Sequence, residues 1–202
     1  SKIQFINNKK YRKIKSKVQN DYLNLEVNEE NMSFVYALSK ILKIKEKSFI
    51  KSLRSFKGLP HRHEIFYKKN NKTFINDSKA TSFEATKFAL KSNKNIFWIV
   101  GGLPKKGDKF KFGNIKKNIT KSYIIGKYFK FFRNQLNGKI PFEYSKTLRK
   151  AVISIFKDLK NNKNQITILL SPASASYDQF NNFEERGNQF KKLIKFYERK
   201  YG

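Results

Sequence analysis

The stretch Ile166–Phe190, ITILLSPASASYDQFNNFEERGNQF, decides how the rest of the chain is interpreted. Its first five residues comprise four aliphatic side chains and one threonine, a run too short for a helix and typical of a buried parallel strand. Pro172 ends the strand because proline cannot donate a backbone hydrogen bond. Small residues at 173–176 leave room at the carboxyl edge of a sheet. Apolar residues then recur at three- and four-residue steps, or their sums, over 180–197, which predicts an amphipathic helix.

A strand, a small-residue loop and a helix form the unit that places ligands at the carboxyl ends of strands in open α/β sheets. The start of the helix has two candidates. Ser176 with Gln179 has the spacing of a capping box, and so has Asn182 with Glu185. If the helix starts at Phe183, its free N–H groups face the small-residue loop and could hold a carboxylate.

Strands and helices alternate upstream, which predicts a Rossmann-like, mostly parallel sheet flanked by helices. Thr81 and Glu84 form a T-x-x-E capping box for one of the helices. The expected elements are a hairpin (64–67 and 73–76), a helix to about 90, strands at 96–100 and 123–125, a helix at 127–136, an edge strand at 142–144 and a helix at 147–159.

Residues 1–57 have a different character. Extended segments are expected at Ile3–Ile6 and Tyr22–Val27. Two helices follow, each with one apolar face: Phe34, Val35, Leu38, Ile41 and Leu42, and then Phe49, Ile50, Leu53 and Phe56. Two short amphipathic helices cannot bury their faces alone, so this part is expected to be the remainder of another domain. Gly58-Leu59-Pro60 marks the junction, which predicts domains at 1–57 and 58–202.

The chain of 202 residues carries 45 Lys+Arg and 15 Asp+Glu, a net charge of +30. Such a charge attracts polyanions, so a basic nucleic-acid-binding module is an alternative hypothesis. The lysines are spread along the chain without a recognition motif, which argues against a specific nucleic-acid partner. The absence of cysteine excludes disulfides and thiolate chemistry. Apolar runs are too short to cross a bilayer and no signal peptide is visible, so a cytoplasmic protein without membrane insertion is expected.

A phosphate-binding P-loop is not present. Gly102 and Gly107 have the spacing of its glycines, but Asp108 occupies the place of the essential lysine and would repel phosphate. Nucleotide binding would therefore depend mainly on other residues. The two histidines, His61 and His63, are too few for a zinc site.

Three ordered motifs carry a resemblance to a known family. SPASASYDQFNNFEERGNQF resembles the last motif of the UDP-N-acetylmuramoyl-L-alanine:D-glutamate ligases, which belong to the Mur ligases. GLPHRHE (58–64) and INDSKAT (75–81) resemble two earlier motifs in the same order. The resemblance runs from about Asn28 to the C-terminus. It implies that 1–57 is the end of the central ATP-binding domain and 58–202 the C-terminal domain. Another Mur ligase or a folylpolyglutamate synthase is the alternative within the class, although the D-N-P motif of the diaminopimelate-adding relatives is absent.

The resemblance implies a set of nucleotide-binding residues. Asn31 would contact the adenine, although Val27 stands where the family often has a histidine. His61 would lie beside the nucleotide, and Arg62 would reach a phosphate across the hinge and act in catalysis. Asp77 would accept hydrogen bonds from the ribose hydroxyls.

The resemblance also implies residues near the reacting groups. Lys79, expected to be catalytic, and Thr81 would face the reacting centre. Lys105 matches the GG-x-x-K lysine that pairs with the side-chain carboxylate of D-glutamate, with Lys106 as the neighbouring alternative. Ser176 and the backbone at Phe183 would hold the same substrate.

The implied reaction is ATP-dependent amide-bond formation. ATP phosphorylates the carboxylate of UDP-N-acetylmuramoyl-L-alanine, and the amine of D-glutamate attacks the acyl phosphate, releasing ADP and phosphate. The Mg²⁺ ligands, the carbamylated lysine, the P-loop and the UDP-binding domain are expected outside this chain. The chain is therefore expected to be inactive alone, and to be a monomer.

Overall fold

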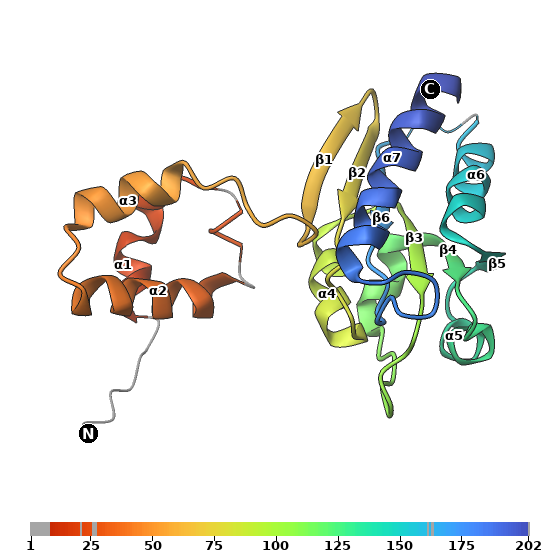
Figure 1. Ribbon diagram of the computed structural model, residues 1–202, viewed down its shortest axis with the longest axis horizontal. Coiled ribbons are helices and arrows are strands. Elements are labelled where there is room, and N and C mark those ends of the chain that lie inside the picture. Colours follow the sequence, from red (N-terminus) through yellow and green to blue (C-terminus); the bar gives the residue numbers. More distant parts are fainter. Residues whose placement is uncertain (1–8, 21, 26–27, 161, 163, 202) are drawn as a thin grey trace. The chain divides into compact units, whose positions relative to one another are not determined.

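The computed structural model describes residues 9–20, 22–25, 28–160, 162 and 164–201 (Figure 1). The chain divides into two compact units, Ser1–Gly58 and Leu59–Gly202. Each unit has its own hydrophobic core. The extended segment expected at Ile3–Ile6 lies outside the described residues.

The described residues of the first unit contain the α-helices α1 (Lys9–Val18), α2 (Glu29–Ile41) and α3 (Glu46–Arg54). Seven side chains form its core: Tyr11, Ile14, Val18, Leu23, Met32, Tyr36 and Phe49. The extended segment expected at Tyr22–Val27 is wrong, because residues 22–25 form turns and a bend, and 26–27 lie outside the described residues. Asn20 stabilises this turn, since its side chain accepts from the Leu23 N–H and donates to the Leu53 carbonyl.

The apolar face predicted for α2 is not the face that the unit buries. Its five members, Phe34, Val35, Leu38, Ile41 and Leu42, are between 44% and 63% exposed. The buried face carries Met32, Ser33, Tyr36 and Ser39 instead. Two of these are small, and the Tyr36 ring packs against Tyr11 and Phe49 at centroid distances of 6.4 and 5.5 Å.

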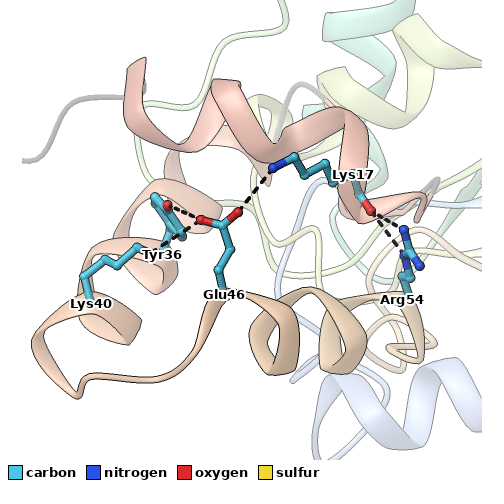
Figure 2. Close-up of polar contacts among 5 residues, drawn as sticks. All are labelled: Lys17, Tyr36, Lys40, Glu46 and Arg54. Carbon is cyan, nitrogen blue, oxygen red and sulfur yellow. Dashed lines mark hydrogen bonds and ion pairs between the residues drawn. The ribbon is translucent and has the colours of Figure 1, made fainter.

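Polar contacts connect the three helices, as Figure 2 shows. Glu46 accepts hydrogen bonds from Lys17, Tyr36 and Lys40 at 3.2 to 3.5 Å. Arg54 donates to the Lys17 carbonyl from Nε and Nη2, at 3.2 and 3.0 Å. The lysine and arginine side chains are exposed, so these contacts contribute little to stability.

The second unit is built on one six-stranded sheet with the order β1-β2-β6-β3-β4-β5. The strands are β1 (Glu64–Lys69), β2 (Lys72–Asn76), β3 (Ile96–Gly101), β4 (Ile119–Ile125), β5 (Phe142–Lys146) and β6 (Ile166–Leu170). Only the pair β1–β2 is antiparallel. Strand β6, predicted as a buried parallel strand at Ile166–Leu170, lies between β2 and β3 and is buried throughout. The α/β fold class predicted from the sequence is confirmed.

Helices cover both faces of the sheet (Figure 1). On one face, α6 (Leu148–Asp158) and α7 (Phe183–Tyr201) pack on alternate strand residues such as Ile168 and Leu170. On the other, α4 (Phe83–Ser92), α5 (Phe129–Leu136) and the 3₁₀ helix η2 (Gly113–Asn118) enclose a core that contains Trp98 and Leu169. Successive residues of a strand therefore point to opposite faces of the sheet and belong to different cores, because side chains alternate along a strand.

Helix starts follow local capping chemistry. The predicted Thr81 cap is wrong: Thr81 is exposed, and Ser82 in extended conformation accepts from the Ala85 N–H at 3.3 Å. For α7, the later of the two candidate starts is confirmed. Asn182 accepts from the Glu185 N–H at 2.7 Å, and α7 begins at Phe183.

Candidate functional site

The carboxyl ends of β2, β6 and β3 lie side by side because these three strands are adjacent and parallel. Backbone hydrogen bonds join the segments that leave them. The Asp77 N–H donates to the Leu170 carbonyl at 2.7 Å, and the Gly101 N–H donates to the Pro172 carbonyl at 3.0 Å. Leu103 and Ala175 form an antiparallel bridge. The candidate site is therefore built at one edge of the sheet, as open α/β sheets build their ligand sites.

Asp77 is a buried carboxylate at the end of β2. One oxygen accepts from the Ser171 hydroxyl at 2.6 Å and the other from the His63 N–H at 3.0 Å. Burial raises the pKa of Asp77 to about 6, against these hydrogen bonds and the positive charge of Arg62, which lower it. Arg62 is exposed and lies close enough to Asp77 for its charge to act on that carboxyl.

His61 is buried beneath the first turn of α7, with a positive φ of 63°. Its Nδ1 lies 2.9 Å from the side-chain nitrogen of Asn76, an amide donor, and this contact favours the tautomer with the proton on Nε2. Burial is the main cause that lowers the pKa of His61, followed by the charge of Lys191. A Cβ at Gly187 would lie 2.2 Å from Nδ1, so α7 needs glycine there to approach His61.

Lys79 and Phe183 are in direct contact. The Lys79 ammonium lies 3.8 Å from the centroid of the Phe183 ring. The backbone N–H of Lys79 donates to the His61 carbonyl at 3.0 Å. The adjacent Ser78 hydroxyl donates to the Phe183 carbonyl at 2.8 Å. The residues around Lys79 are thereby fixed to the start of α7.

Arg186 is a central residue that the sequence interpretation did not single out. It is 1% exposed and donates to the Ser78 hydroxyl and carbonyl at 3.0 and 2.8 Å, and to the Ser174 carbonyl at 3.0 Å. Its Nη1 has no hydrogen-bond partner among the residues that the structure describes. Burial lowers the pKa of Arg186 to about 10, against the opposing charge of Asp178. Arg186 therefore connects the loops after β2 and β6 as a buried cation held by carbonyl and hydroxyl groups.

The backbone at Gly101-Gly102 closely approaches its neighbours. Gly102 has a φ of +135°, and a Cβ there would lie 2.3 Å from the Ala175 carbonyl oxygen and 3.2 Å from Nη1 of Arg186. A Cβ at Gly101 would lie 2.0 Å from the Ile125 carbonyl oxygen. Both glycines are thus required by their surroundings.

Lys105 and Lys106 follow the bridge at Leu103 and are both exposed, so the structure brings both to the same loop. The Asp108 carboxylate accepts from the Phe83 N–H at 2.8 Å, which gives it a structural role at the start of α4. Ser176 is buried in the loop after β6, where its carbonyl accepts from the N–H groups of residues 179 and 180.

Asn31 belongs to the first unit, on the exposed side of α2. The first unit also has a groove of about 980 Å³ lined by α1 and α3, whose charged residues are Lys17, Glu46, Lys47, Lys51 and Arg54. Within the described part of the chain, no group of three or more histidine or acidic side chains is arranged to hold a metal ion. No helix in that same part is long and apolar enough to span a bilayer.

Comparison with solved structures identifies the class of fold. MurF from Acinetobacter baumannii matches 84% of this chain with 37% of its own, at a TM-score of 0.57 and 14% identity. The bifunctional folylpolyglutamate synthase/dihydrofolate synthase from Yersinia pestis CO92 matches 85% of this chain with 40% of its own, at a TM-score of 0.56 and 11% identity. The chain therefore has the fold of part of a Mur ligase or folylpolyglutamate synthase. No protein-family model matches the chain.

Three proteins that are similar to this chain in sequence are ligases of one kind within this fold class. The UDP-N-acetylmuramoylalanine–D-glutamate ligase of Wolbachia sp. subsp. Brugia malayi is 40% identical over 85% of this chain. Those of Nitrobacter hamburgensis and Rickettsia conorii are 40% and 38% identical over 83% and 82%. The chain spans about a third of the length of these relatives. The resemblance found in the sequence is confirmed: over most of its length the chain is homologous to the D-glutamate-adding Mur ligases.

Proposed function

We propose that this chain provides the D-glutamate pocket and one wall of the ATP cleft of an ATP-dependent ligase. The ligase adds D-glutamate to UDP-N-acetylmuramoyl-L-alanine in peptidoglycan precursor synthesis. The observation that supports this most is the meeting of the loops after β2, β3 and β6 at one edge of the sheet, where Arg186 and the Leu103–Ala175 bridge connect them. The identity to D-glutamate ligases favours this substrate over those of other Mur ligases.

D-glutamate is a dianion at neutral pH, and the surroundings of this edge suit it. Lys105, or its neighbour Lys106, would pair with the side-chain carboxylate. The Ser176 hydroxyl and the free N–H at Phe183 would hold the substrate at the positive end of a 19-residue helix. Lys79 and Thr81 would face the reacting carboxyl. Holding the amine in line with an activated carboxyl is the main contribution that such a site makes to rate.

The nucleotide side of the site would use four residues. Asp77, with a pKa of about 6, is mostly ionised at neutral pH, and its two observed hydrogen bonds leave acceptor sites for ribose hydroxyls. Arg62 would bind a phosphate with its guanidinium, His61 would lie beside the nucleotide, and Asn31 would contact the adenine. ATP, when bound, activates the carboxylate of UDP-N-acetylmuramoyl-L-alanine as an acyl phosphate.

The P-loop and the ligands of Mg²⁺ would come from the part of such a ligase that the relatives have and this chain does not match. The chain is accordingly proposed to be inactive by itself. Closure of this chain and the rest of the ligase over the substrates would assemble the complete site, as the closure of lids and domains does in other enzymes.

The test joins this chain to the preceding two-thirds of the Wolbachia relative and measures ADP release. We expect release that depends on both UDP-N-acetylmuramoyl-L-alanine and D-glutamate, and that L-glutamate does not replace. Asp77→Asn should abolish most of it, while Lys109→Ala, an exposed lysine on the loop after β3, should not. ADP release that is indifferent to the amino acid would refute the proposal.

The alternative function is nucleic-acid binding, and the groove of the first unit, with four basic residues and one acidic residue in its lining, is where a nucleic acid would bind. A dedicated module should bind duplex DNA tightly at about 200 mM salt, where counterion release weakens unspecific attraction. We expect binding of this chain to be lost there. Retained binding at that salt would favour the alternative.

A further inference from the structure

We propose that the side chain of Phe183 is a positioning residue for Lys79: its ring holds the ammonium group at the substrate edge without neutralising its charge. This inference rests on the proposed function, which assigns only the backbone of Phe183 to the substrate. The ring is half-buried at the first residue of α7. It therefore stands at the point where the loop after β2 meets the loop after β6.

The distance between the two groups is the first argument. Lys79 Nζ lies 3.8 Å from the ring centroid, whereas the other cation–ring pairs in the described parts of the chain lie at 5.0 to 5.9 Å. Attraction between a cation and an aromatic face extends to about 6 Å and strengthens where water is excluded. Lys79 and Phe183 are both half-buried, and their distance is the shortest of these, so their contact is the strongest candidate for such an attraction.

Both ends of the contact are fixed. On the Lys79 side, the backbone N–H is bonded to His61, and Ser78 is bonded to the Phe183 carbonyl and to Arg186. On the other side, the ring of Phe183 meets the His61 imidazole edge-on, at a centroid distance of 5.9 Å and an angle of 80°. The ring cannot turn away from Lys79 without losing this second contact.

Lys79 has no acidic partner in the part of the chain that the structure describes. Lys79 takes part in none of the ion pairs that the described residues form. The nearest carboxylate in sequence, Asp77, already binds Ser171 and His63. A carboxylate partner would cancel the charge that a substrate meets, whereas an aromatic face orients the ammonium and leaves its charge available. The occupant that this arrangement suits is a carboxylate or phosphate oxygen of an acidic substrate.

The contact itself can be measured on the 202-residue chain without any ligand. Protons that lie over a ring face resonate upfield, so the ε-methylene protons of Lys79 should be shifted upfield of those of other lysines. Lys79→Met identifies the signal by removing it. Phe183→Leu should abolish the shift and Phe183→Tyr should keep it. The indole proton of the single tryptophan, Trp98, which donates to the Ser171 carbonyl, reports that each variant is folded. An unshifted Lys79 signal in the folded wild-type chain would overturn the inference.

The positioning role is then tested by titrating D-glutamate into the joined ligase that carries the same substitutions. Phe183→Leu should weaken binding about three- to thirtyfold, the range of a cation–π contact, and Phe183→Tyr should restore it. In the Lys79→Met background, Phe183→Leu should have no further effect, whereas a merely structural ring would cause the same loss in both backgrounds. Additive losses would therefore overturn the inference. If the wild-type chain shows the shifted signal but the joined ligase does not bind D-glutamate, the D-glutamate pocket is refuted and the contact of the ring with Lys79 is supported.

Discussion

Replacing Asp77 by asparagine should change the stability of the second unit in a pH-dependent way that reverses sign. Burial raises the pKa of this carboxyl from 3.8 to about 6. Because the folded-state value is raised, the carboxyl favours folding most below about pH 4, and this contribution declines as the pH rises and is lost above about pH 6. A difference of roughly two pKa units corresponds to about 3 kcal/mol, as an order of magnitude.

Asparagine has nearly the same shape and removes this pH dependence. It accepts hydrogen bonds through one oxygen only, so the donors Ser171 and His63 are less well satisfied, at a cost of about 1 kcal/mol. We therefore expect Asp77→Asn to be about 2 kcal/mol more stable than the wild-type chain at pH 8. At pH 4 it should be about 1 kcal/mol less stable.

Urea unfolding between pH 4 and 8 would test this through the fluorescence of Trp98, which is fully buried in the second unit. Asp158→Asn is the matched control. That carboxylate is half-exposed and bound to Lys121 and Tyr123, so its loss should not stabilise the chain at high pH. If Asp77→Asn is less stable than the wild type across the whole pH range, burial does not dominate at Asp77 and the reasoning fails.

Three further predictions concern the loops at the same edge. Arg186→Met removes three hydrogen bonds from a buried cation and should lower the free energy of unfolding by about 3 kcal/mol, measured in urea; a loss below about 1 kcal/mol would contradict its connecting role. Gly102→Ala would place a Cβ 2.3 Å from a backbone oxygen and should cost about 2 kcal/mol or more, whereas Gly107→Ala, with open space around its Cβ, should cost less in the same measurement. In the joined ligase, Lys105→Ala should raise the KM for D-glutamate more than that for ATP; unchanged values for both would point to Lys106.

The strands of the second unit could be predicted from the sequence because each carries its own signal. The buried runs at β3 and β6 are short, apolar and followed by glycine or proline. Their length and these strand-ending residues are enough to predict both strands. Strand β4 is longer than predicted and starts at Ile119, because three polar residues, Thr120, Lys121 and Ser122, precede its apolar run and hid the beginning of the strand. Its pairing with β3 along this whole length is a tertiary contact that no local pattern contains.

The first unit shows where periodicity misleads. In α2 the most apolar residues recur at helical spacing, and the prediction that this segment is helical was correct. The buried face, however, contains Ser33 and Ser39, whose hydroxyls bond to the carbonyls of Glu29 and Tyr36 within the helix. Satisfying the serine hydroxyls inside the helix makes their burial inexpensive. Apolarity alone could not indicate which face meets α1 and α3.

Arg186 shows why the most connected residue of the candidate site was missed. It lies three residues after Phe183 and four before Phe190, in phase with the face of α7 that packs on the sheet. An arginine on the apolar face of a predicted helix can indicate a buried, functional cation. Such an arginine can be buried only where hydrogen-bond acceptors meet it, and most of the acceptors of Arg186 belong to Ser78, 108 residues away in the sequence. Although the charge of Asp178 acts on it, Arg186 forms no ion pair with the residues that the structure describes, so this cation adds a positive potential beneath the loops where Lys79 and the start of α7 already provide one. A buried positive charge held by hydroxyl and carbonyl groups thus favours an acidic ligand at this edge.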